Sequence, residues 1–382
     1  MSVPKALVMH LVGLSFLLAT APAALAQPAA APQPAPSKFT SPDDGWIDLS
    51  GFLASRYGFL PIASPITEPA VGLGVAAGLA FMSAPMASGR PNITGIGGLG
   101  TENGTKGAFA GDIRYWRDHR VQTIAKVVYA SVSLDFYGIG HDSVLADNPL
   151  RYNLEPTGAS FETKLRLGMS SVWVGASYAY AQTSVRFDAP EGTPGRPAIT
   201  RESNVGGLTP SLTVDTRDNM FTPTRGTYVE GRADIFSANL GGDDDFQRLR
   251  AVGMQFVPLP RRVFLGIRGE AAATFGDAPF YLRPFIYQRG VPAMRYQGDH
   301  LVQIETEVRW QFWKRISAVV FAGGGKTWAG SDRDRSDQAA AGGLGFRYEL
   351  ARAYGIHVGA DFAYGPAGHA FYIQVGSAWA KP

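Results

Sequence analysis

Three short groups of residues in this sequence could in principle carry out catalysis. Glu305 and Glu307 alternate along a predicted strand, so their carboxyl groups share one face about 6.5–7 Å apart. Paired carboxylates at such a spacing could hydrolyse a glycoside by acid–base chemistry. His141 stands two residues before Ser143, where an imidazole could activate the hydroxyl. Residues 324–327, Gly-Gly-Lys-Thr, look like the end of a phosphate-binding loop.

Each of these groups also has a simpler structural explanation. A phosphate-binding loop needs a Gly five residues before its Gly-Lys pair, where this chain has Val320. His141 and Ser143 fall in a predicted loop without a companion Asn motif, so we interpret them as solvated loop residues. Glu305 and Glu307 would serve as wall charges of a polar lumen. We therefore predict that the protein is not an enzyme and has no catalytic residue.

The composition excludes several other classes of function. The chain has 382 residues and no Cys, which leaves no disulfide framework and no thiolate metal site. The His residues lack metal-ligand spacing, and we expect neither a metal nor a cofactor. Lys and Arg number 35 against 32 Asp and Glu, so no basic surface for nucleic acid is expected. The 46 Gly and 12% aromatic residues favour strands and turns over a helical bundle.

The N-terminus indicates export from the cytoplasm. Residues 1–26 contain one Lys, a short apolar run and an Ala-Leu-Ala exit, which is typical of a cleaved signal peptide. Residues 27–45 begin with a tract rich in Pro and Ala and are predicted to be a periplasmic linker. Residues 46–382 then form the folded part, and we expect no folded domain before them.

The folded part repeats strands of ten to thirteen alternating residues, separated by turn residues. In residues 301–312, charged and amide side chains occupy one parity, whereas Ile, Val, Thr, Trp and Phe occupy the other. Long strands with a charged face and aromatic ends predict an antiparallel transmembrane β-barrel. About fifteen strands are clear, and a bacterial barrel needs an even number. Adding a weak first strand at residues 49–60 predicts sixteen, the last of which spans residues 371–379.

Two motifs carry the interpretation beyond a general barrel. The first is a compact turn with the pattern Asp-x-Arg-Asp-x-x-x-x-Pro-x-x-Gly, formed by Asp215, Arg217, Asp218, Pro223 and Gly226. In such a turn the Asp side chains can cap the backbone, and Pro fixes φ. This pattern resembles the turn of the bacterial surface antigen barrel, the BamA/TamA-like family of outer-membrane assembly factors.

The second motif lies in the longest connection, at residues 276–298 and just beyond, and is similar to the Arg-Gly loop of that family. The resemblance implies that the loop tip folds into the lumen and holds its Arg against carboxylates on the wall. A loop of such length usually has a function, and Gly at its tip permits a tight turn. The motif residues are Arg289, Gly290, Arg295, Gly298 and Asp299.

The expected lumen partners of the loop Arg are Glu305 and Glu307. Family members often carry an Asp for this purpose on the wall strand that corresponds to residues 319–328. That segment has no carboxylate here, so the pairing of Arg289 with Glu307 is a hypothesis.

The resemblance covers residues 65–379 and implies a function as well as a fold. It implies a barrel in the outer membrane of a Gram-negative bacterium, in a form without the periplasmic substrate-binding repeats. The expected role is in outer-membrane biogenesis, at a weak junction between the first and last strands. Its partners would be outer-membrane lipid and, as clients, other outer-membrane proteins. The alternative is a passive or plugged pore, or a structural barrel without insertase activity.

Overall fold

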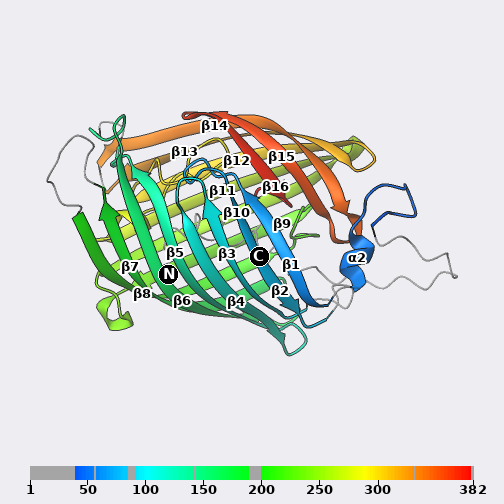
Figure 1. Cartoon of the computed structure of the whole chain (residues 1–382), viewed down its shortest axis with the longest axis horizontal. Helices are drawn as coiled ribbons and strands as arrows, with labels where there is room; N and C mark the ends of the chain where they lie inside the picture. Colours follow the sequence, from blue (N-terminus) through cyan, green and yellow to red (C-terminus); the bar gives the residue numbers. More distant parts are fainter. Residues whose placement is uncertain are drawn as a thin grey trace.

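The computed structural model of the chain describes residues 39–379, except for 56, 85–90, 141–142, 189–198 and 331. The predicted signal peptide and most of the predicted linker lie outside the described residues. The described part is a sixteen-stranded antiparallel sheet that curls into a barrel (Figure 1). The predicted fold class and strand number are therefore confirmed. None of the helices in the described residues is long and apolar enough to cross a membrane.

Every strand pairs with the next one along the chain, in the order β1 to β16. The strands are β1 (Gly58–Ile66), β2 (Gly74–Met82), β3 (Ile93–Thr101), β4 (Lys106–Trp116), β5 (Val121–Phe136), β6 (Leu150–Arg166), β7 (Val172–Phe187), β8 (Ile199–Asp215), β9 (Gly226–Phe236), β10 (Phe246–Leu259), β11 (Val263–Gly276), β12 (His300–Trp313), β13 (Ile316–Ala329), β14 (Asp332–Ala351), β15 (Ile356–Gly365) and β16 (Gly368–Val375). Both the start of β1 and the end of β16 lie at one end, which we call the terminal end. The opposite end, with the connection 277–299, is the loop end.

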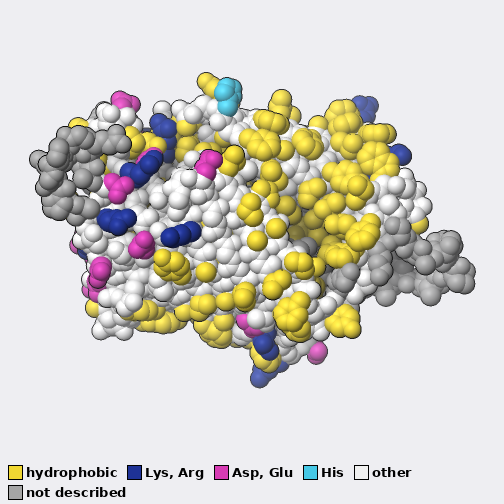
Figure 2. All heavy atoms as spheres, viewed as in Figure 1, with side chains coloured by type: hydrophobic (Ala, Val, Ile, Leu, Met, Phe, Trp, Pro, Cys, Tyr) yellow, Lys and Arg dark blue, Asp and Glu magenta, His cyan; other side chains and the backbone are white. Residues whose placement is uncertain are grey.

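The alternation of side chains sorts each strand into a lumen face and a lipid face. In β12, Leu301, Gln303, Glu305 and Arg309 are buried, whereas Val302, Ile304, Val308 and Trp310 are exposed. Apolar side chains gather on much of the outer surface toward the terminal end, and charged ones gather toward the loop end (Figure 2). This distribution matches a wall that faces lipid toward the terminal end and water at the loop end.

The two largest of the five buried apolar clusters in the described residues lie at opposite ends of the barrel. At the loop end, inward-facing residues of β5 to β10, among them Leu134 and Leu154, pack against Tyr281, Leu282 and Met294 of the connection 277–299. At the terminal end, a second cluster gathers around a short helix and two turns. The members of this second cluster are Leu53, Leu60, Ala80, Met82, Ile93, Ile113, Ile124, Phe221, Ala351, Tyr354 and Ile356.

The boundary between β1 and β16, which we call the seam, differs from every other strand boundary. Among the described residues no hydrogen-bonded ladder joins these two strands, whereas all fifteen neighbouring pairs in the order have one. In this described part of the chain, one hydrogen bond crosses the seam, from the backbone N–H of Ile373 to the hydroxyl of Thr67, the residue after β1, at 3.2 Å. The barrel is therefore curled but not closed by backbone pairing.

The predicted first strand at residues 49–60 is wrong in its position. Residues Ser50–Ser55 form a helix, α2, and β1 begins only at Gly58. The apolar residues Leu49, Phe52 and Leu53 recur at helical spacing, which buries Leu53 in the terminal-end cluster. Gly58, with a φ of 80°, then redirects the chain into the strand. Residues 39–45, which the prediction assigns to the linker, contact the folded part, because Thr40 pairs with Ile47.

The open seam predicts uneven hydrogen exchange around the barrel. In detergent micelles, we expect seam-facing amides of β1 and β16 to exchange about ten-fold or more faster than amides between β10 and β11, since unpaired backbone opens at little cost. The measurement is deuterium uptake by mass spectrometry. Equal protection at both boundaries would mean that the seam is closed by a ladder.

Candidate functional site

The connection between β11 and β12 folds into the lumen from the loop end. Its first part carries a short 3-10 helix, Phe280–Leu282. Isolated backbone bridges then join Phe285 to Gln297 and Gln288 to Val291, which shapes a narrow hairpin. Arg289 and Gly290 form the tip of this hairpin, and Gly290 has a φ of 86°, a conformation that favours Gly.

The side chain of Arg289 ends among three carboxylates on the wall. Its Nε lies 2.8 Å from Oε1 of Glu305, and its Nη1 lies 2.7 Å from Oε2 of Glu307 and 2.8 Å from Oδ2 of Asp361. The guanidinium also lies over the ring of Phe321, 3.7 Å from the ring centroid. The Arg289 residue is 6% exposed. A buried guanidinium with this many partners holds the loop tip firmly to the wall.

A second Arg completes the cluster. Arg347 in β14 donates from Nη1 to Oδ1 of Asp361 at 2.5 Å and from Nη2 to Oδ2 at 2.9 Å. The cluster thus joins β12, β13, β14 and β15 to the loop, with two guanidinium groups facing three carboxylates. Such mutual pairing offsets the cost of burying each charge.

Sequence reasoning missed Asp361. No carboxylate lies on β13, where the resemblance led us to look, and Phe321 supplies an aromatic face there instead. The missing carboxylate comes from β15, two strands along, where Asp361 and His357 form the polar parity of the strand. That alternation is the sequence signal for Asp361, because it marks every lumen-facing carboxylate of the last five strands as a candidate partner of Arg289.

The wall opposite the loop tip is made of Gly and Ala. A Cβ added to Gly290 would lie 2.8 Å from the Cβ of Ala341 and 3.2 Å from that of Ala363. A Cβ on Gly323 would lie 2.7 Å from Oε1 of Gln288. The Gly run in β13, which resembled a phosphate-binding loop, is therefore a flat surface on which the loop rests.

The loop also touches both sides of the seam. The N–H of Gly290 donates to the hydroxyl of Tyr372 in β16 at 2.9 Å, and the N–H of Ala293 donates to Oε1 of Glu68 at 3.2 Å. Glu68 belongs to the connection between β1 and β2. The loop tip therefore bridges the two strands that lack a ladder.

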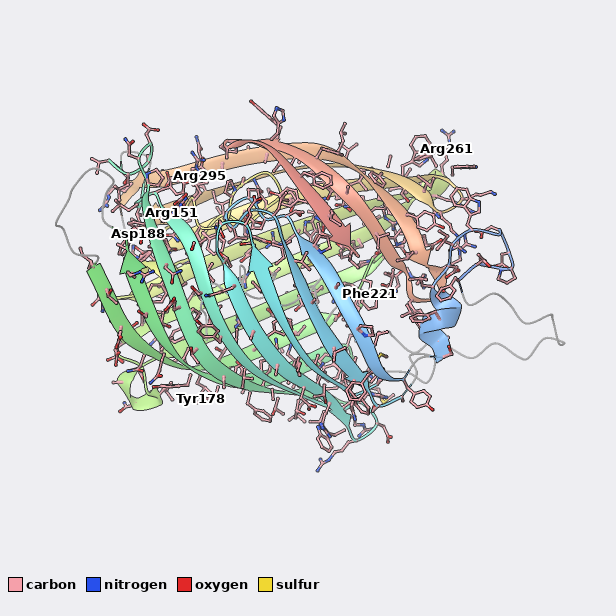
Figure 3. The ribbon with its side chains drawn as sticks, in the orientation of Figure 1. Arg151, Tyr178, Asp188, Phe221, Arg261 and Arg295 are labelled. Atoms are coloured by element: carbon pink, nitrogen blue, oxygen red, sulfur yellow. The ribbon has the colours of Figure 1, made fainter. Side chains whose placement is uncertain are left out.

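The other loop-motif residues lie away from the Arg289 cluster. Arg295 stacks over the ring of Tyr137, 4.9 Å from its centroid, near the loop end (Figure 3). Asp299 pairs with Arg283 at 3.1 Å and accepts the N–H of Gly330 at 2.7 Å. Gly298 lies so close to β13 that a Cβ would approach the carbonyl of Trp328 to 2.7 Å. These three residues fasten the base of the loop.

The turn motif lies at the terminal end and is not part of the cluster. Arg217 donates from Nε and Nη2 to the carboxylate of Asp215 at 2.9 and 2.8 Å, and Asp218 accepts the N–H groups of Thr224 and Arg225. Pro223 is buried and Gly226 has a φ of 103°. The turn thus stabilises itself.

The same turn supports the last strand. Phe221, labelled toward the terminal end in Figure 3, accepts the N–H of Ser377 on its carbonyl at 2.5 Å. The predicted last strand at residues 371–379 is too long, because β16 ends at Val375 and Gly376 has a φ of 80°. Residues 376–379 turn into the lumen instead.

This tail reaches the Arg289 cluster. The indole N–H of Trp379 donates to Oε2 of Glu305 at 2.7 Å, and Trp379 packs with Tyr228, Met254 and Phe256. Glu305 therefore holds the loop with one carboxylate oxygen and the tail with the other. Nothing in the residue pattern predicted this contact.

Replacing Arg289 with Ala should destabilise the barrel by about 3–5 kcal/mol, since three carboxylates would lose a buried partner. Exchanging the charges of Arg289 and Glu307 should not restore stability, because Glu305 and Asp361 would then face a new carboxylate. The measurement is urea unfolding in lipid vesicles. Arg295→Ala, in the same loop, is the control and should cost about 1 kcal/mol or less. Equal stability of the two single variants would contradict the role of the cluster.

Glu68 should make the stability of the folded barrel depend on pH. Desolvation raises the pKa of Glu68 from 4.5 to about 7, so the folded state favours the protonated acid. Its stabilising contribution is fully present below pH 4.5 and is lost as the pH rises through 7. The melting temperature of the wild type should therefore fall, relative to that of Glu68→Gln, between pH 5 and pH 8.

The control for this measurement is Glu102→Gln, the same carboxyl-to-carboxamide change in the connection between β3 and β4, against which the effect of Glu68→Gln is compared. A constant difference between wild type and Glu68→Gln at all pH values would show that Glu68 does not titrate in this range.

Comparison with known proteins agrees with this geometry. The Omp85 superfamily domain matches residues 89–377. BamA from Haemophilus ducreyi lacking POTRA domains 1–3 has a similar structure, with a TM-score of 0.60, 13% identity, and coverage of 84% of this chain and 69% of that one. CdiB from Escherichia coli gives a TM-score of 0.57 at 10% identity, covering 90% and 64% of the respective chains. No curated protein sequence matches. The chain belongs to the Omp85 superfamily.

Proposed function

We propose that the protein acts in outer-membrane biogenesis by inserting or handling outer-membrane proteins or lipids at the seam. The observation that carries this proposal is the absence of a ladder between β1 and β16 among the described residues. Unpaired N–H and C=O groups along a strand edge can pair with another extended chain. The seam is therefore the natural place for an incoming strand of a client protein.

The wall is also shortest at the seam. β16 has 8 residues and β1 has 9, whereas β8 has 17 and β14 has 20. A tilted strand needs about 9–11 residues to span the bilayer. A wall at or below this length favours local thinning of the bilayer, which lowers the barrier for inserting a client or moving a lipid.

The occupied lumen argues against the passive pore. The loop crosses the barrel interior with Ile286, Val291 and Met294 almost wholly buried, and the tail carrying Trp379 enters from the terminal end. A buried ion pair joins the loop to the wall, and a buried hydrogen bond from Trp379 joins the tail to it. A conducting channel would have to release these contacts first, so a plugged barrel fits the arrangement better than an open one.

The remaining sequence predictions enter this proposal unchanged. Residues 1–26 would direct export, and the terminal end with its short turns would face the periplasm of a Gram-negative bacterium. Membership of the Omp85 superfamily supports an outer-membrane location. The partners would be outer-membrane lipid and client outer-membrane proteins, with no enzyme activity.

A disulfide across the seam should abolish this function. The chain has no Cys, so Thr67→Cys with Ile373→Cys forms a defined pair where the two strands already touch. We expect the oxidised protein to lose about 90% or more of its support for other outer-membrane barrels, and reduction to restore it, because a locked edge cannot accept a strand. The measurement is the level of those barrels after depletion of the wild-type protein.

The matched control is Phe362→Cys with Phe371→Cys, which bridges β15 and β16 at positions that are ladder partners. This disulfide should leave activity unchanged. Full activity of the oxidised seam pair would rule out the proposal, and a steady open conductance in planar bilayers would favour the pore instead.

A further inference from the structure

The segment before β1 lies across the terminal end of the barrel. Residues 39–49 lead into α2 (Ser50–Ser55), and β1 begins three residues after the helix, at Gly58. Figure 1 shows α2 at the terminal end, beside the end of β14 and the turn that follows it. We call residues 39–55 the strap.

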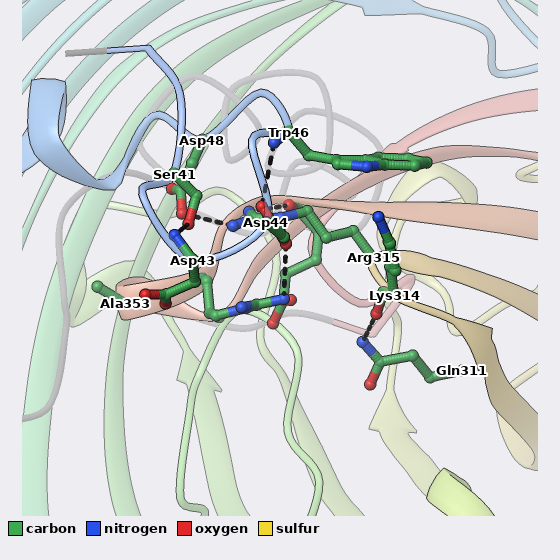
Figure 4. A network of polar contacts seen from close by, with 12 residues as sticks. Ser41, Asp43, Asp44, Trp46, Asp48, Gln311, Lys314, Arg315 and Ala353 are labelled. Carbon is green, nitrogen blue, oxygen red and sulfur yellow. Dashed lines mark hydrogen bonds and ion pairs between the residues drawn. The ribbon is translucent and has the colours of Figure 1, made fainter. Parts of the chain in front are cut away.

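The strap is anchored to the far side of the seam through Arg315, in the turn between β12 and β13. Its Nε lies 2.8 Å from Oδ2 of Asp44 and its Nη2 lies 2.9 Å from Oδ2 of Asp48 (Figure 4). The side chain of Arg315 is fully buried. A buried guanidinium that loses such partners is left with an uncompensated charge. Separating only one of the two carboxylates from Arg315 is therefore already costly.

Further contacts continue the anchor along β14 and the turn after it. The N–H of Leu49 donates to the carbonyl of Leu350 at 2.8 Å, and the hydroxyl of Tyr348 donates to the carbonyl of Ile47 at 2.7 Å. The N–H of Ala353 donates to the hydroxyl of Ser50 at 3.0 Å.

Aromatic contacts complete the anchor. The ring of Trp46 packs edge-on against Trp313, with centroids 4.9 Å apart, and lies parallel to Tyr348. Lys314 lies over the Trp46 ring. The strap is thus bound to the turn between β12 and β13 and to β14 by charges, backbone hydrogen bonds and rings.

The strand order shows that the strap connects the two sides of the seam. The strap continues covalently into β1, on one side of the seam. It binds the turn between β12 and β13 and strand β14, which lie beyond β15 and β16 on the other side. Three Cα–Cα steps join Ser55 to Gly58, and three steps span at most about 11 Å. The start of β1 therefore cannot move farther than this from the anchored end of α2.

We propose that the strap limits the opening of the seam, with Asp44 and Asp48 on Arg315 as its lock. This regulatory role rests on the proposed function of the seam. β1 cannot move far from β16 at the terminal end until the Arg315 contacts are released. The loop contacts to Tyr372 and Glu68 restrain the other end of the same seam.

The test measures the width of the seam directly, without a client. Spin labels at Phe59→Cys in β1 and Ile373→Cys in β16 both lie on the outer surface. Their distance distribution is measured by double electron–electron resonance in lipid vesicles. In the Asp44→Asn, Asp48→Asn variant we expect the distribution to broaden and its mean to increase by several ångström, because the neutral amides no longer balance the guanidinium.

A second variant keeps every contact of the strap and only lengthens the link between α2 and β1. Six Gly and Ser residues inserted between Ser55 and Gly58 should broaden the same distribution. Asp112→Asn, which removes a carboxylate from the exposed Asp112–Arg114 pair on the outer wall, is the matched control and should match the wild type. A shift in electrophoretic mobility between unheated and heated samples checks that each barrel is folded.

The outcomes separate this proposal from the proposed function. Unchanged distances in both folded strap variants would overturn the strap, whatever the variants do to client assembly. Wider distances with unchanged levels of other outer-membrane barrels would support the strap and count against the biogenesis role. Wider distances with altered client levels support both.

Discussion

A backbone N–H or C=O that faces hydrocarbon without a partner costs several kcal/mol, and this constraint governs the whole barrel. Fifteen strand boundaries meet it with hydrogen-bonded ladders. Among the described residues, the seam between β1 and β16 has no ladder, and the two strands beside it are among the shortest in the wall. The barrel therefore concentrates its unsatisfied backbone at one line, and other parts of the chain gather around that line.

Three segments that are not wall strands act near the seam, and two of them meet at Glu305. This carboxylate binds Arg289 of the inward loop with one oxygen and Trp379 of the tail with the other. The loop also contacts Glu68 and Tyr372 on the two sides of the seam. The strap restrains the terminal end. Together they hold the barrel where backbone pairing is missing.

The sequence predicted the wall well because alternation is a local property of each strand. It also placed Arg289 opposite the strand that carries Glu305 and Glu307. It could not predict Asp361 as a third partner, since the position of β15 relative to the loop depends on barrel curvature. The sequence predicts a strand where residues 50–55 form a helix, because a short apolar run fits both the two-residue repeat of a strand and the 3.6-residue repeat of a helix. The inward turn at Gly376 and the Arg315 anchor join residues distant in sequence, which no pattern reveals.

The central claim is that clients engage the seam and not another part of the wall. The most direct measurement places a photo-reactive amino acid at Phe59 in β1 or, as a reference, at Leu249 in β10, both exposed to lipid. After irradiation of living cells, the account predicts cross-links to other outer-membrane barrels from Phe59 and none from Leu249. Equal cross-linking from both positions, or none from Phe59, would contradict it.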